Sequence, residues 1–157
     1  MRKIRNKRIA LYIAATALLL LGDRGVDIGQ LRPVEVVQLY EKGGLLFLKT
    51  DTGDVGWGLT VDGAIAKLKE TTPGRIYLDT ADYLLLEVGT EEYADSLKPY
   101  LKNRTAMVYG PEEMDLQAAA SYLRIHRPSA RVKNGQNPAE TISIEGGKII
   151  LKKFKEK

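Results

Sequence analysis

The chain has 157 residues, of which 44% are hydrophobic and 28% are charged, and it contains no cysteine. A chain of this length can form one domain with a hydrophobic core. The absence of cysteine excludes disulfides, thiolate nucleophiles and cysteine-ligated zinc or iron–sulfur sites. The net charge of +4 is smaller than the five positive charges within residues 2–8. The remainder is therefore close to neutral, and the basic composition does not predict a nucleic-acid partner.

The N-terminus predicts a membrane segment. A basic stretch precedes residues 9–22, which carry no charge, and Asp23 and Arg24 end the apolar run. This layout is typical of a signal anchor or a signal peptide whose basic end stays in the cytoplasm. A helix of this length rises about 21 Å, which is less than the roughly 30 Å hydrocarbon core. Snorkelling of the flanking Arg and Lys side chains makes up part of the difference.

No cleavage motif of the A-x-A type follows the apolar run, so we expect residues 1–22 to remain as an anchor through which the chain contacts the lipid bilayer. The domain then lies on the extracytoplasmic side of the cell membrane, with secretion after signal cleavage as the alternative. A buried helix of a cytoplasmic domain is a third interpretation, which the basic residues disfavour. Residues 23–33 contain Gly25, Gly29 and Pro33 and predict a linker.

Residues 34–157 predict a single domain that opens with a β-meander and a helix. The strand candidates are residues 34–40, 45–50 and 55–58, with turns at 42–44 and 51–54. Thr60 is a candidate N-cap for a helix whose apolar stripe comprises Val61, Ala64, Ile65 and Leu68. The dipeptide Pro73-Gly74 predicts the end of this helix.

The second half of the domain predicts further strands and two more helices. Residues 75–78, 83–88 and 105–109 are strand candidates. One predicted helix is capped by Thr90 and runs to Leu101, and another begins at Pro111 and ends before Pro128. Residues 129–141 are predicted to form a loop, and residues 141–145 and 148–154 a closing hairpin. The fold class that follows is α+β, with a mixed or antiparallel sheet and about three packed helices, preceded by the N-terminal hydrophobic helix.

No pattern of residues predicts chemistry, so we expect no catalytic, cofactor-binding or metal site. The single histidine, His126, follows a helical run, where it complements the helix dipole. Asp79 and Asp82 stand at a strand break, where Asp usually caps a turn. The acidic turn at residues 51–54 lacks the later ligands of a calcium loop. Trp57 suits either the core or a partner surface, and the candidate partner-binding residues are Trp57, Asp79, Asp82 and Tyr83.

Several segments, in order, resemble the N-terminal domain of the Ger(x)C-type C subunit of spore germinant receptors. The sequence LGDR at 21–24 is similar to the end of the family's signal segment, and TVDGAIAKL at 60–68 is similar to its T-x-x-E-A-x-x-x-L helix. RIYLDTADYLLL at 75–86 resembles its R-x-Y-x-x-H strand and the apolar strand that follows. YLKNR at 100–104 matches the next family segment loosely.

Two departures limit what this resemblance implies. Asp23 stands near the position of the family's lipid-bearing cysteine, so the same lipid attachment cannot occur. The sequence also stops at residue 157, without the family's two further domains. The resemblance implies a fold and an extracytoplasmic, membrane-tethered setting, and it carries no catalytic residues.

We therefore expect a non-catalytic, membrane-tethered accessory or binding domain resembling a truncated germinant-receptor C subunit, with membrane proteins as partners. One alternative is a small hydrolase using Asp79 and Asp82, with His126 as an added base, which requires these groups to converge in a pocket. Another is a protein that binds anionic surfaces through residues 152–157.

Overall fold

The computed structural model describes residues 31–135 and 137–155. The predicted hydrophobic helix and most of the predicted linker lie outside the described residues. Residues 31–33, which the sequence placed in the linker, instead form strand β1 (Leu31–Pro33) of the domain, because they pair in parallel with β5 (Arg75–Tyr77). This two-stranded ribbon is separate from the main sheet.

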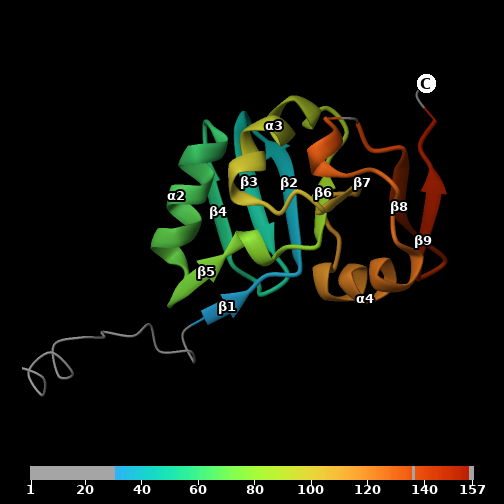
Figure 1. The fold of residues 1–157 in the computed structure, drawn as a ribbon, viewed down its shortest axis with the longest axis horizontal. Helices are drawn as coiled ribbons and strands as arrows, with labels where there is room; N and C mark the ends of the chain where they lie inside the picture. The colour runs from blue at the N-terminus through green and yellow to red at the C-terminus, as the bar shows by residue number, and fades with distance from the viewer. Residues whose placement is uncertain (1–30, 136, 156–157) are drawn as a thin grey trace, which may run out of the picture. The chain divides into compact units, whose positions relative to one another are not determined.

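A seven-stranded mixed sheet forms the centre of the domain (Figure 1), in the order β4-β3-β2-β6-β7-β8-β9. The strands are β2 (Val36–Lys42), β3 (Leu45–Thr50), β4 (Val55–Gly58), β6 (Tyr83–Leu86), β7 (Ala106–Tyr109), β8 (Glu140–Glu145) and β9 (Lys148–Lys153). The middle strands β2, β6 and β7 run parallel, whereas β2-β3-β4 and β8-β9 are antiparallel. The predicted α+β class with a mixed sheet and three helices is confirmed.

Two hydrophobic layers flank the sheet. On one face, α2 (Val61–Thr71) and α3 (Ala94–Leu97) pack on strand residues such as Leu39, Leu48 and Leu86. On the other face, α4 (Leu116–His126) packs on Val108 and Ile142. The central strand β6 is buried along its whole length, as expected for a parallel strand covered on both faces.

Helix α2 forms as the sequence predicts. Thr60 caps it by accepting a hydrogen bond from the Gly63 N–H at 3.1 Å, and its four predicted core residues are buried. The helix packs unusually close to β4, because a Cβ on Gly58 would lie 2.7 Å from the Ala64 nitrogen. Two glycines in β4 therefore let the backbones of strand and helix approach one another.

Two predicted helices are wrong in extent. The third begins at Leu116 and not at Pro111, because the Asp115 side chain accepts hydrogen bonds from the N–H groups of Gln117 and Ala118 and so caps the helix there. The second is reduced to α3 between two 3-10 turns, Glu91–Tyr93 and Lys98–Tyr100.

Thr90 does not cap that second helix, since its hydroxyl donates to the Glu87 carbonyl at 2.8 Å. Pro99 lies in the second 3-10 turn, where its ring ends the α-helical hydrogen bonding. Near the C-terminus, residues 151–153 belong to β9, and the centroid of the Phe154 ring lies 4.3 Å from that of Tyr109.

Candidate interaction surface

Among the described residues, no helix covers one half of the sheet on the face opposite α2. Helix α4 contacts β2 and β9. Within the described residues, the hydrophobic cluster under α4 contains no side chain from β3 or β4. Val36 and Gln38 of β2 also point to this face but are buried, and Lys42 is paired with Glu112. The other side chains of β2, β3 and β4 on this face form the surface that we call the open face: Tyr40, Leu45, Phe47, Lys49, Val55 and Trp57.

An aromatic row crosses the open face at one register position. Tyr40 pairs with Phe47 across β2 and β3, and Phe47 pairs with Trp57 across β3 and β4. The rings of Tyr40 and Phe47 stack with centroids 5.2 Å apart and planes 8° apart. Such a cross-strand aromatic pair places two large apolar side chains side by side on this face.

Trp57 is the most exposed part of this row. Its exposed fraction is 41%, and Leu59, just beyond the end of β4, is 80% exposed. The Nζ atom of Lys67 lies 5.3 Å from the centre of the indole ring, a cation–π distance. The sequence left open whether Trp57 belongs to the core or to a surface, and the structure places it at the surface because its neighbours Gly56 and Gly58 occupy the side toward α2.

Lys49 lies beside the aromatic row, between Gln38 and Val55 in the register. Its side chain is half-buried, and its Nζ reaches the Met114 carbonyl oxygen at 3.5 Å, a long hydrogen bond. Among the described residues, no carboxylate forms an ion pair with Lys49. The open face therefore presents a cation without a local counter-charge.

Gln38 is buried under the segment that leads from β7 to α4. Its Nε2 donates to the Pro111 carbonyl at 2.6 Å. Its Oε1 is buried and has no hydrogen-bond partner within the described part of the chain. This bond ties residues 110–115 to β2 and explains why Pro111 is held away from α4.

Charged pairs border the open face on two sides. Lys42 bonds to Glu112 at 2.6 Å, and this hydrogen bond raises the pKa of Lys42. Burial and the nearby carboxylate of Glu112 raise the pKa of Tyr40 above its ordinary value. On the side of α2, Lys67 pairs with Glu70 at 3.0 Å. Both border lysines thus have carboxylate partners, whereas Lys49 has none among the described residues.

The four predicted partner-binding residues do not form one surface. Trp57 lies on the open face, whereas Tyr83 is only 8% exposed and packs in the core under α4. Asp82 bonds to Lys102 at 3.0 Å. Asp79 is exposed in the 3-10 turn Leu78–Thr80 after β5.

The groups of the hydrolase alternative are also separated. Asp79 lines a hollow between β5 and the turn at Tyr100, whereas Asp82 lines another beside Glu35 and Arg124. His126 lines neither hollow and stacks on Tyr122 with ring centroids 4.1 Å apart. In the described ranges, no group of three or more His, Asp or Glu side chains is placed to hold a metal ion.

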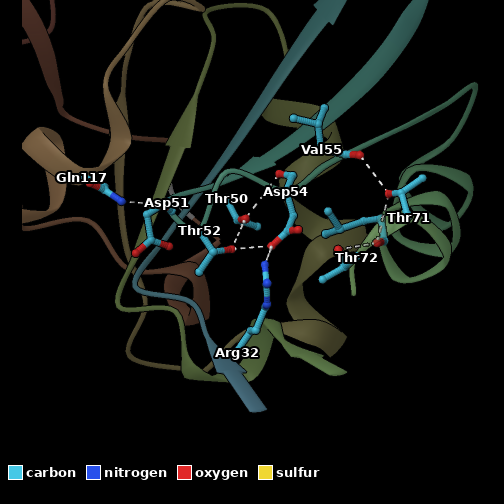
Figure 2. Close-up of polar contacts among 10 residues, drawn as sticks. Arg32, Thr50, Asp51, Thr52, Asp54, Val55, Thr71, Thr72 and Gln117 are labelled. Carbon is cyan, nitrogen blue, oxygen red and sulfur yellow. Dashed lines mark hydrogen bonds and ion pairs between the residues drawn. The ribbon is translucent and has the colours of Figure 1, made fainter. Parts of the chain in front are cut away.

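Residues 51–54 form the turn that the sequence predicts, and Figure 2 shows the contacts of the Asp54 carboxylate with Thr52 and Arg32. Asp54 accepts hydrogen bonds from Thr52 at 2.7 Å and from Arg32 of β1 at 3.5 Å. Asp51 accepts from the N–H groups of Glu35 and Val36 at 3.1 and 3.2 Å. These carboxylates thus hold the start of β2 and the β1 ribbon to the turn.

Sequence reasoning found Trp57 and missed the rest of the aromatic row. The signal was present in part, because Tyr40 and Phe47 fall in two predicted strands joined by a short glycine turn, and this spacing fixes which residues lie opposite each other. What the sequence does not contain is the information that no helix covers this half of the sheet.

Comparison with known proteins gave no match, whether with protein-family models, curated proteins or solved structures. No helix in the described part of the chain is long and apolar enough to cross a membrane.

Proposed function

We propose that this chain is a non-catalytic accessory domain, tethered to the extracytoplasmic side of the cell membrane by residues 9–22, that binds partner membrane proteins. The open face carries this proposal. Soluble domains rarely leave large aromatic side chains of a sheet without cover unless something binds there. Trp and Tyr are also the residues that most often dominate the binding energy of protein interfaces.

The basic and apolar composition of residues 1–22 supports the membrane setting. The resemblance to the germinant-receptor C subunit supports a role beside other membrane proteins, and it makes germinant-receptor-like subunits the first partners to test.

The test has two parts. In a spore-forming host, the tagged full-length chain is expected to remain in the membrane fraction, with its C-terminal tag open to protease added from outside. A photo-crosslinking amino acid at Phe47 is expected to give a defined adduct with a membrane protein, and the same amino acid at Ile125, an exposed residue of α4, is not. A soluble cytoplasmic chain, or equal adducts at both positions, would contradict the proposal.

A further inference from the structure

We infer that the open face receives one amphipathic helix of a partner protein, whose apolar ridge covers the aromatic row and whose carboxylate pairs with Lys49. This inference rests on the proposed function, and it names the class of partner that the surface fits.

The sheet edges favour a helix over an added strand. At the β4 edge, the Val55 carbonyl accepts a hydrogen bond from the Thr71 hydroxyl at 3.3 Å, and α2 packs against this strand. At the β9 edge, the Leu151 N–H donates to the Tyr122 hydroxyl at 3.0 Å. One outward backbone group is thus engaged by a side chain at each edge, which makes an added strand less favourable there. We take the face as the route of binding.

The dimensions of the open face fit one helix. The uncovered strip spans the strands β2 to β4, which are about 4.8 Å apart, so its width is roughly that of a helix with its side chains. On the opposite face of β3 and β4, one helix of 11 residues, α2, provides the cover. A helix in trans would complete the same layer on the second face.

The charge of the open face selects an acidic helix. Lys49 is half-buried beside apolar rings, where a carboxylate from a partner gains more than it does at a fully exposed site. Residues 9–22 of this chain carry no carboxylate, and the proposed function places them in the bilayer. A second copy of the open face would supply a second Lys49 and no carboxylate among the six residues that define the face. A partner with apolar and acidic side chains is the occupant that these charges fit.

Trp57 is the only tryptophan, so its fluorescence reports directly on this surface. The probe is a synthetic 15-residue helical peptide without tryptophan, with leucines along one face and glutamates beside them. It is titrated into the full-length protein in nanodiscs of neutral lipid. A saturable blue shift of Trp57 emission is expected. A matched peptide with lysine in place of each glutamate is expected to bind about tenfold more weakly.

Charge reversal sharpens the test. Lys49→Glu is expected to weaken binding of the glutamate peptide about tenfold and to strengthen binding of the lysine peptide. Lys148→Glu makes the same charge change at an exposed position of β9 and is expected to leave both affinities unchanged. Absence of a shift, or equal binding of both peptides to both variants, would overturn the inference.

Three other outcomes would also overturn it. A Trp57 shift that depends on protein concentration without peptide would identify a second copy as the occupant. If iodide fails to quench Trp57 fluorescence in the full-length protein but quenches it after residues 9–22 are deleted, the occupant of the open face is the chain's own segment. If the peptide fails to bind while the Phe47 crosslink to a membrane protein persists, the helical partner is wrong and the proposed function survives.

Discussion

The strand residue Gly56 lies so close to helix α2 that a Cβ on it would come within 2.1 Å of the Ala64 carbonyl oxygen and 2.5 Å of the Leu68 nitrogen. Both atoms belong to the helix backbone, which cannot turn aside as a side chain can. The contact between strand and helix therefore depends on glycine at this position, and it fixes the side of β4 on which Trp57 emerges.

Gly56→Ala is accordingly expected to destabilise the protein by about 3 kcal/mol or more, because the strand must move away from α2. Gly63→Ala is the control. Its Cβ would meet the Thr60 hydroxyl oxygen at 3.3 Å and the Gly58 Cα at 3.7 Å, and alanine favours the helix by about 1 kcal/mol over glycine. Urea denaturation followed by circular dichroism separates the two. Equal losses would mean that the backbone approach is not the cause.

Asp115→Ala is expected to lower the free energy of unfolding by about 1 kcal/mol, since it removes the acceptor for two N–H groups at the start of α4. Asp115→Asn keeps a capping oxygen and is expected to lose far less. Pro111→Ala should leave helix content unchanged, because α4 begins five residues later. If Pro111→Ala lowers the helical circular dichroism signal, the helix begins at Pro111, as the sequence first suggests.

Glu91 gives the protein an acid-sensitive contact. Burial raises the pKa of Glu91. Hydrogen bonds from the backbone N–H groups of Gly89 and Glu91 and from the Tyr109 hydroxyl lower it, and together they outweigh burial, so the pKa lies below its ordinary value of 4.5. A carboxyl group with a lowered pKa in the folded state stabilises the protein above its unfolded pKa, and this contribution is lost as the pH falls through the folded pKa.

Glu91→Gln is therefore expected to be less stable than the natural protein at neutral pH, and the difference should vanish on acidification below the folded pKa. Denaturation curves collected from pH 7 to pH 2 measure it. Glu92→Gln is a neighbouring control, since Glu92 is exposed. A difference between Glu91→Gln and the natural protein that stays constant across this range would show that the carboxylate charge plays no part.

The Arg124 guanidinium donates hydrogen bonds to both carboxylate oxygens of Glu35, with Nη2 2.9 Å from Oε1 and 2.6 Å from Oε2. This pair joins α4 to the residue just before β2, and the Glu35 side chain is 27% exposed. In a double-mutant cycle with Arg124→Ala and Glu35→Ala, we expect a favourable coupling that decreases at high salt. The exposed Lys67–Glu70 pair within α2 should show about 0.3 kcal/mol.

Local signals predicted those parts of the fold that are built from neighbouring residues. Thr60 and the apolar stripe of α2 needed only the next turn of chain, and the closing hairpin needed only the glycine pair between its strands. The start of α4 was mistaken because Pro111 with two following acids matches a helix start as well as Asp115 does. In the structure Asp115 caps the helix, whereas the Pro111 carbonyl accepts a hydrogen bond from Gln38, 73 residues away in the sequence.

The order of the strands was not accessible from sequence for the same reason. Gln38 lies opposite Leu85, and Leu85 lies opposite Val108, and nothing near any of these residues specifies the pairing. The open face follows from this order, because it exists only where the meander extends beyond the reach of α4. A tryptophan can be read from the sequence, but its exposure depends on how distant segments cover the sheet.

The β1–β5 ribbon also determines how the domain responds to pulling. Tension on the chain ahead of Leu31 reaches the domain through a pairing of only three residues and through the Arg32–Asp54 contact. Next along the chain, the backbone of Val34 forms two hydrogen bonds with the Thr80 hydroxyl, which accepts from the Val34 N–H at 2.8 Å and donates to the Val34 carbonyl at 2.9 Å. Under such tension we expect the three-residue ribbon to separate before the Thr80 contacts with Val34 break. Strand β2 and the aromatic residues that it carries would then keep their geometry.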